Sequence, residues 1–408
     1  MKNEKLGLTH EQEQKKVTRG VLLGAAFLMA TSSVGPGFLT QTTVFTEQLA
    51  ASFGFVILIS LILDVFAQMN IWRVIAVSGL RGQEIANKVL PGLGFVLAFL
   101  IVAGGLAFNI GNVAGAGLGL NAMVGIDPIM GALISAVFAI LIFMVKEAGK
   151  VMDKVVAVAG VIMIILVVFV AFKTSPPVGE AIIRTFNPSE ISFFAIVTLV
   201  GGTVGGYITF AGGHRLLDAG IKGIDSVPLV TRSSVTGIAV TGIIRVALFL
   251  AVLGIVAQGL QIDPDNPPAS VFQLGAGELG LRLFGVIMWV AAITSVVGAA
   301  YTSVSFIRSF HPLIEKYHNW IIILFIVIST ATFAFVGKPV TILLLVGALN
   351  ALILPLALGT LLIAAYKKDI VGEYKHPLWL TIGGAIVVVV MGVLGVMTLI
   401  EQIPLLFD

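Results

Sequence analysis

Two clusters of glycine interrupt long apolar stretches of the sequence, and both have residue types that leave backbone groups free to bind. The first is GPG at residues 35–37, in a stretch rich in Ser and Thr, and the second is GGTVGG at residues 201–206. Gly and Pro break helices, and unwound backbone inside a membrane is tolerated only where it is buried in protein or lines a cavity. We therefore predict that the two breaks form a substrate site.

A simpler explanation is that each glycine lets two helices pack closely. That explanation suits a single glycine. Two clusters at matching places, one of them with a proline, instead favour paired broken helices that meet at the middle of a membrane. The residues of this site are then Ser33, Gly35, Gly37, Gly202 and Gly205. None of them is charged, so binding would rest on carbonyl, N–H and hydroxyl groups.

Two ionisable residues, Asp64 and Arg245, lie in the middle of apolar segments. Such residues are costly inside a membrane and suggest a functional site with a partner. They are able to pair with each other or to face water. The alternatives are a purely structural ion pair and an arginine that reaches the membrane surface, and the sequence leaves all of these open.

Asn109 and Asn112 are about one helical turn apart and share a face of their predicted helix. Amide side chains in membrane helices hydrogen-bond across to neighbouring helices. That role suits the pair slightly better than a polar path for the substrate, and we keep both. An amide does not titrate, so neither residue is able to carry protons as a carboxylate does.

The composition identifies an integral membrane protein. The chain has 408 residues, of which 58% are hydrophobic and 11% are charged, whereas soluble proteins contain about 25% charged residues. Cysteine is absent, which excludes disulfides and thiolate metal sites. No enzyme motif and no basic patch for nucleic acid is evident, so we expect no enzyme, no cofactor, no nucleic-acid partner and no obligatory protein partner. The expected partners are the lipid bilayer and a small transported substrate.

The candidate site residues lie in apolar runs that are long enough to span a bilayer. We predict eleven, at 20–47, 51–79, 91–121, 126–145, 152–173, 190–212, 228–259, 281–307, 319–337, 340–366 and 378–400. The two glycine clusters lie in the first helix of each block of five, which predicts inverted repeats at 20–173 and 190–366. The helix at 378–400 is additional.

The distribution of Lys and Arg predicts the orientation. With a cytoplasmic tail at 1–19, eighteen of these residues fall on the cytoplasmic side and four outside. The short end at 401–408 is then external. We expect a multi-pass protein of the cell membrane.

Three stretches resemble a known family. Leu23–Phe27 followed by Val34–Gly37, the stretch Asn109–Gly115, and the loop Val371–Lys375 are similar to segments of the Nramp divalent metal-ion transporters. The resemblance covers about residues 20–400. It implies an all-α, leucine-transporter-like fold of the APC superfamily, with an inverted 5+5 helix repeat and an eleventh helix. It also implies metal-ion symport by alternating access around broken helices 1 and 6.

The resemblance also implies roles that this chain has altered. Gly35 stands at the position of the family's metal-binding Asp, Phe38 at that of its Asn, and Gly205 at that of its Met. Tyr207 replaces a His of the proton route, and Asn109 and Asn112 replace an Asp and a Glu. Two short side chains at the middle of the membrane imply a larger cavity. Thr294 and Ser295 align with a Ser-Ser pair, which makes them candidate ligands for a coupling sodium ion, although hydroxyls often bond to their own helix.

Two hypotheses follow. The resemblance implies a secondary active transporter of divalent ions such as Mn²⁺ or Mg²⁺. The altered site instead suits a small organic carboxylate or amino-acid-like solute, with or without sodium coupling, because half-helix N-termini attract anions while transition metals favour carboxylate and thioether ligands. The identity of any bound metal is unknown.

Overall fold

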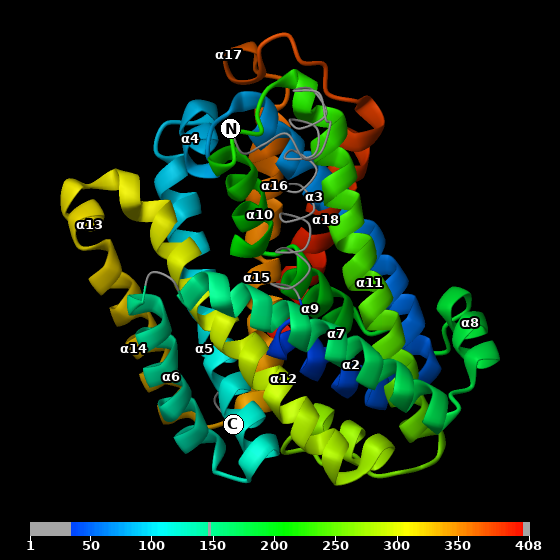
Figure 1. The fold of residues 1–408 in the computed structure, drawn as a ribbon. Helices are drawn as coiled ribbons and strands as arrows, with labels where there is room; N and C mark the ends of the chain where they lie inside the picture. Colours follow the sequence, from blue (N-terminus) through cyan, green and yellow to red (C-terminus); the bar gives the residue numbers. More distant parts are fainter. Residues whose placement is uncertain (1–33, 146–147, 403–408) are drawn as a thin grey trace, which may run out of the picture.

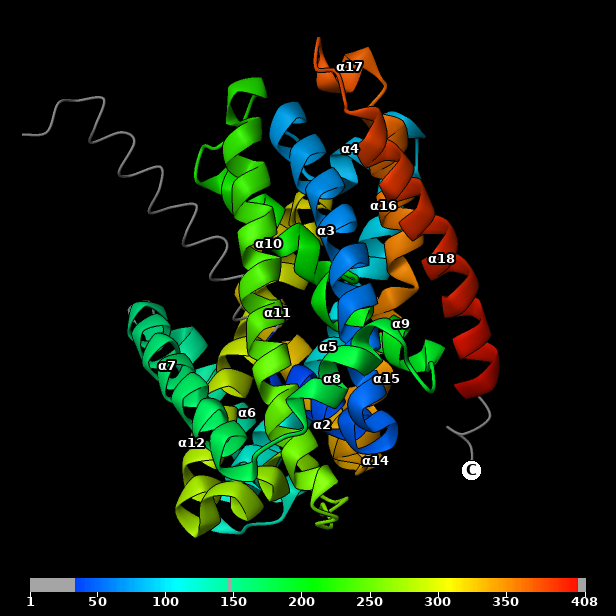
Figure 2. The same ribbon diagram turned by 90° about the vertical axis from the view of Figure 1, so that its right-hand side faces the viewer.

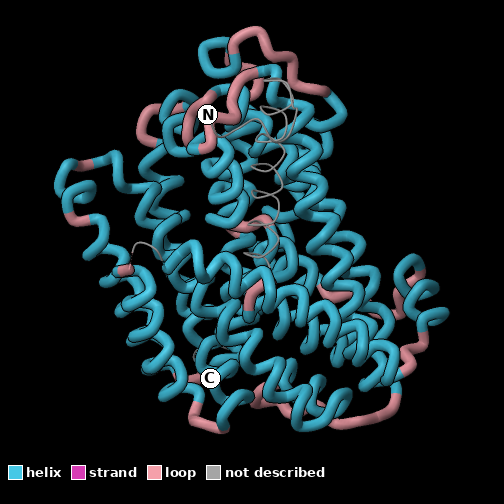
Figure 3. The backbone as a smooth tube through the Cα atoms, viewed as in Figure 1, coloured by secondary structure: helices cyan, strands magenta, loops and turns pink. Residues whose placement is uncertain are grey.

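In the computed structural model, residues 34–145 and 148–402 are described, and they form a bundle of helices joined by short loops (Figures 1 and 3). The helices are α2 Pro36–Leu49, α3 Phe53–Ser78, α4 Gly82–Val89, α5 Leu93–Val124, α6 Pro128–Met144, α7 Ala148–Thr174, α8 Val178–Phe186, α9 Phe193–Thr203, α10 Tyr207–Asp218, α11 Val227–Ala257, α12 Pro267–Ile307, α13 Pro312–Lys316, α14 His318–Val336, α15 Pro339–Ala351, α16 Ile353–Ala364, α17 Lys368–Val371 and α18 Leu378–Gln402.

The length and hydropathy of the helices are those of a protein that crosses a membrane many times. Within the described ranges, 8 helices are long and apolar enough to span, or 9 if α7 and α8 are one bent span; α6 is shorter. Every predicted segment from the second onward overlaps at least one helix, whereas the first half of segment 1 lies outside the described residues. The count of eleven therefore stays a prediction. The expected connection at 174–189 contains α8. Helix α12 runs from Pro267 but is kinked at Gly277, with φ 70° and ψ −164°, so the part after the kink begins close to the predicted 281.

Helix α5 lies at the centre of the bundle, where α2, α6, α12 and α15 pack against it (Figure 1). Glycines permit this close approach. A Cβ atom at Gly115 would lie 2.0 Å from Cβ of Pro36 in α2, and one at Gly117 would lie 2.1 Å from the carbonyl oxygen of Pro128 in α6. At Gly119 it would lie 2.7 Å from the backbone nitrogen of Trp289 in α12. Small residues give membrane helices this kind of backbone contact.

The break in the sixth segment is confirmed. Helix α9 ends at Thr203, and α10 begins at Tyr207. Gly206 joins them with φ 51° and ψ −123°, which is a conformation that L-residues with a side chain avoid. The hydroxyl of Thr209 donates to the carbonyl of Val204 and so satisfies one backbone group of the unwound turn. The second glycine cluster therefore separates two half-helices, as predicted.

The break in the first segment is described on one side. Helix α2 begins at Pro36, directly after Gly35, which has an extended backbone at φ −99° and ψ −171°. Proline at the first helical position suits a helix start, because it has no N–H to satisfy. Ser33 and the preceding half of the segment lie outside the described residues.

A third interruption was not predicted. The expected helix 340–366 consists of α15 and α16, which meet at Leu352. Pro355 follows within one turn, and its ring nitrogen has no hydrogen to donate to the carbonyl of Ala351. Proline inside an apolar segment was thus the available signal.

Helix α18 packs at the edge of the bundle against α16 and α3 (Figure 2). The loop before it is anchored by His376, whose Nε2 lies 2.8 Å from Oδ1 of Asn70. The Asn70 amide nitrogen in turn donates to the carbonyls of Phe66 and Leu380. Because Nδ2 is occupied as a donor, Oδ1 accepts and His376 Nε2 carries the hydrogen.

This histidine predicts a loss of stability in acid. Burial and the nearby charge of Arg73 lower the pKa of His376 from 6.5 to about 4. The unfolded chain therefore binds a proton before the folded chain does, and stability falls as the pH drops from 6.5 to 4. We expect His376→Asn to lower stability at neutral pH but to flatten this decline. Thermal unfolding in detergent at several pH values checks it, and an unchanged pH profile in the variant would contradict the assignment.

Candidate functional site

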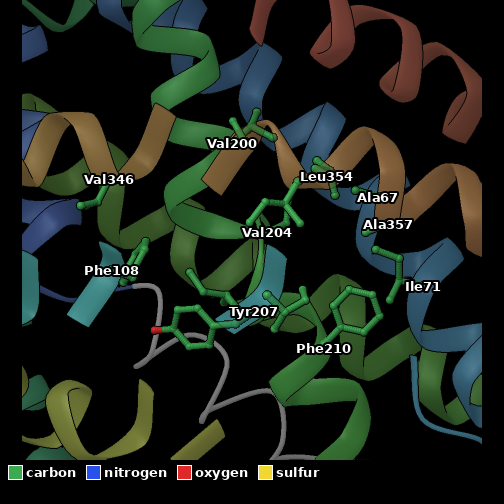
Figure 4. Packing of buried hydrophobic residues seen from close by; sticks show 14 of the residues in the cluster. Ala67, Ile71, Phe108, Val200, Val204, Tyr207, Phe210, Val346, Leu354 and Ala357 are labelled. Carbon is green, nitrogen blue, oxygen red and sulfur yellow. The ribbon is translucent and has the colours of Figure 1, made fainter. Parts of the chain in front are cut away.

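The two breaks meet in the interior, between α5, α15 and α3. Buried apolar residues surround the second break: Val200 precedes its glycines, Val204 lies among them, and both lie above Tyr207, which follows them, in the view of Figure 4. The ring of Tyr207 contacts Phe108 of α5 edge-on, at 5.5 Å between centroids. A rigid apolar frame therefore holds the unwound turn.

The two asparagines of α5 have different surroundings. Asn109 donates from Nδ2 to Oγ of Ser329 at 3.1 Å, which links α5 to α14. This contact fits the packing role. Asn112 lies beside the hydroxyl of Tyr207 instead, and it is buried. Asn112 thus faces the break, while Asn109 keeps its buried Oδ1 without a hydrogen-bond partner among the described residues.

The expected enlargement of the cavity rested on Gly35 and Gly205, and the structure gives the surroundings of Gly205 and of the neighbouring Gly37 and Gly202. A Cβ atom at Gly202 would lie 2.8 Å from Oε1 of Gln41, and one at Gly205 would lie 2.9 Å from the carbonyl oxygen of Asn350. Gly37 also faces Gln41, at 3.5 Å from its Nε2. Backbone and amide groups occupy the space that the shorter side chains leave, so the glycines allow contact instead of opening a void.

Two amide side chains of the site were missed. Gln41 of α2 donates from Nε2 to the carbonyl of Leu343 at 2.9 Å. Asn350 of α15 donates to the carbonyls of Gly104 and Val346, each at 3.0 Å. In the described residues, Gln41 Oε1 and Asn350 Oδ1 have no hydrogen-bond partner. The sequence signals were a Gln inside the polar run TQTT and a single Asn in an otherwise apolar segment.

Further buried oxygens around the breaks also lack partners. Among the described residues they are the hydroxyls of Thr40, Thr42, Thr198 and Ser303 and the amide of Asn112. Buried polar groups in native proteins are nearly always hydrogen-bonded to protein, water or a ligand. These neutral oxygens therefore suit water or the hydration shell of a bound ion.

Asp64 on α3 and Arg245 on α11 lie close enough to interact electrostatically. Their proximity agrees with one of the predicted alternatives. Both side chains have 0% exposure. No direct ion pair joins them in the described part of the chain. Thr203 lies between them, at the end of α9: its Oγ1 accepts from Nη1 of Arg245 at 3.2 Å. The guanidinium also lies over the ring of Phe38, with Cζ 4.3 Å from the centroid.

The candidate sodium ligands remain untested. Thr294 of α12 donates to the carbonyls of Val290 and Ala291 in its own helix, at 3.0 and 2.9 Å. Ser295 is half-buried beside it. Back-bonding uses the hydroxyl hydrogen and leaves oxygen lone pairs free, so the sodium role stays a prediction.

A conventional metal cage is not found in residues 34–145 and 148–402, where no three His, Cys, Asp or Glu side chains come together to hold an ion. The oxygen donors at the breaks are instead carbonyls, hydroxyls and amides. Hard divalent ions accept such neutral oxygens when they keep part of their water shell. The donor set therefore fits a partly hydrated ion better than a fully dehydrated transition metal.

Comparisons with known proteins agree with this architecture. The sequence model of the family described as "Natural resistance-associated macrophage protein-like" matches residues 26–401. A Bacillus subtilis protein called "Uncharacterized membrane protein YcsG" is 67% identical over 97% of this chain and 100% of its own length. A Staphylococcus saprophyticus protein called "Divalent metal cation transporter MntH" is 23% identical over 93% of this chain and 91% of its own.

Among solved structures, a mutant form of a manganese transporter of Eremococcus coleocola superposes with a TM-score of 0.72. It is 17% identical in sequence, and the match covers 98% of this chain and 90% of that one. At this identity the likeness shows the fold, which is the leucine-transporter-like arrangement of helices.

Proposed function

The chain belongs to the Nramp family of membrane transporters, and from that premise we propose that it moves a divalent metal ion across the cell membrane by alternating access. The observation that carries the proposal is the α9–α10 break beside the start of α2, where buried oxygens lack protein partners among the described residues. Unwound backbone of this kind binds coupling ions and substrates in transporters built from inverted repeats.

The named relatives support a metal as cargo. One is called a divalent metal cation transporter and another a manganese transporter. They do not favour the alternative of an organic solute carried alone. Because the metal-binding Asp and Met of the family are Gly35 and Gly205 here, we infer that the ion keeps more of its water and binds more weakly.

We propose that the substrate path is lined by the two breaks. Its residues are Ser33, Gly35, Gly37, Phe38, Gly202, Gly205, Tyr207 and Asn112, with Gln41 and Asn350 added from the geometry. Asn109 remains a further candidate, because its Nδ2 donates to Ser329 of α14 while its Oδ1 has no hydrogen-bond partner among the described residues.

The orientation is also proposed. The excess of Lys and Arg on one side places the N-terminus in the cytoplasm and the C-terminus outside. This arrangement needs an odd number of spans, such as the eleven predicted, because the two ends then lie on opposite faces of the membrane.

Uptake into proteoliposomes tests the proposed function. We expect vesicles that contain the purified chain to take up Mn²⁺ or Mg²⁺ faster than protein-free vesicles do. The half-saturating metal concentration should be higher than in a family member that has the Asp ligand, because this chain lacks that anionic ligand. Uptake equal to that of protein-free vesicles for both ions would refute metal transport.

We also expect metal uptake to produce little or no acidification of the vesicle lumen. Asn109, Asn112 and Tyr207 replace the titrating groups of the family's proton route. A pH-sensitive dye sealed inside the vesicles gives the readout, with an ionophore added as the positive control. Strong acidification driven by Mn²⁺ would show that another group carries protons.

A further inference from the structure

The guanidinium of Arg245 is a buried charge with an open side. Its side chain has 0% exposure. Nη1 donates to Thr203, and the Phe38 ring covers one face. Nε and Nη2 have no hydrogen-bond partner among the described residues. A buried charge is stable only when it is paired and its hydrogens are satisfied, so the open side requires an acceptor.

The open atoms share one edge of the guanidinium plane. Nε–H and Nη2–H point in parallel, and this is the fork that binds the two oxygens of a carboxylate. A cation would be repelled at this edge. A single water molecule has only one oxygen and would not accept from both Nε–H and Nη2–H in the parallel geometry of a carboxylate. The chemistry therefore selects an anion with two coplanar oxygens.

Asp64 does not supply those oxygens. It is fully buried near Arg245 and lies beside the hydroxyl of Thr203 rather than against the guanidinium, and neither carboxylate oxygen makes a full hydrogen bond in the described residues. The net charge of the two side chains is zero, but Nε and Nη2 of Arg245 still have no acceptor among the described residues. A ligand with a carboxylate and a cationic part would satisfy both, with the carboxylate at Arg245 and the cation toward Asp64.

The position connects this site with the moving parts. Phe38 lies in the first turn of α2 and Thr203 is the last residue of α9, so Arg245 contacts both broken helices at their breaks. A ligand held there would bind the two conformations of the breaks unequally, which is the requirement for shifting the equilibrium between them.

We propose that Arg245 binds a carboxylate group that is part of the cargo. The inference deepens the proposed function, because it adds an organic anion to the same site and rests on that function for its role in transport. The carboxylate has two sources: an acid that binds beside the metal ion as a second solute, or an acid that chelates the transported metal ion.

Thermal unfolding of the purified full chain in detergent tests binding. The probes are sodium acetate, L-glutamate and citrate, each with and without Mn²⁺, with sodium chloride and acetamide as references. We expect at least one carboxylate to raise the melting temperature above both references. Stabilisation without Mn²⁺ identifies a free acid, and stabilisation only with Mn²⁺ identifies a chelate; either supports the proposal. No stabilisation by any of the three in either condition would overturn it.

Arg245→Lys keeps the charge but removes the fork, so we expect at least a tenfold weaker apparent affinity for the stabilising carboxylate. Arg232→Lys, on the exposed side of the same helix, is the matched control and should bind as the unmodified chain does. Equal affinity in the Arg245 and Arg232 variants would overturn the proposal.

If Arg245→Lys does not fold, Thr203→Val gives the second test, because it removes the acceptor that orients the guanidinium. Unchanged carboxylate affinity in Thr203→Val also counts against the proposal. Mn²⁺ uptake in carboxylate-free buffer reports separately on the proposed function.

Discussion

Replacing Gly206 by alanine is expected to lower the uptake rate by at least about tenfold, which corresponds to roughly 1.4 kcal/mol. Gly206 has φ 51° and ψ −123°, where a residue with a side chain is strained by about 1–3 kcal/mol. The added Cβ would also lie 2.0 Å from Oδ1 of Asn350, which Gly104 and Val346 hold in place. Uptake in proteoliposomes, normalised to reconstituted protein, measures the effect.

Gly372 provides the matched control. It has nearly the same backbone conformation, φ 61° and ψ −131°, but nothing lies within 4 Å of a Cβ built there. Gly372→Ala therefore carries the strain without the collision and outside the site. We expect it to cost some stability and to leave uptake close to normal. Equal loss of uptake in both variants would mean that the break has no special role.

Removing one of the two buried charges is expected to cost about 3–5 kcal/mol of folding free energy, because the remaining charge stays buried without compensation. Asp64→Asn and Arg245→Gln should each show this loss. The double variant should be more stable than the sum of the single losses implies, since no charge then remains. Chemical unfolding in detergent measures the free energies, and Arg232→Gln serves as the exposed control.

Additivity of the two losses would show that Asp64 and Arg245 do not compensate each other in the folded chain. Charged groups far apart behave in this way, and groups that share a local network do not. The prediction therefore separates a coupled pair from two independent buried charges.

The position of the helix breaks was accessible to sequence reasoning because backbone chemistry is local. GGTVGG at residues 201–206 and Pro36 leave few helical choices to the chain, and the structure has helix ends at these places. The break at Leu352 was equally local, and Pro355 indicated it. The fold followed from the same breaks together with the family resemblance.

The contents of the site were less accessible because they depend on contacts between distant segments. Gln41 meets Gly202, and Asn350 meets Gly205 and Gly206, across more than a hundred residues of chain. A single sequence shows that a side chain has become shorter, but it does not show which neighbour moves in. For this reason the sequence predicted the break at residues 201–206 but not the approach of Gln41 and Asn350 to its glycines.

The glycines of α5 differ in what a genetic screen would recover. A larger residue at Gly115 collides with the side chain of Pro36, so a change at position 36 is able to relieve it. Larger residues at Gly117 and Gly119 collide with the backbone of Pro128 and Trp289, and every amino acid keeps its backbone. Loss-of-function alleles at these two positions would therefore have no suppressor at the contacted residue, and only true revertants or substitutions that shift a whole helix would restore transport.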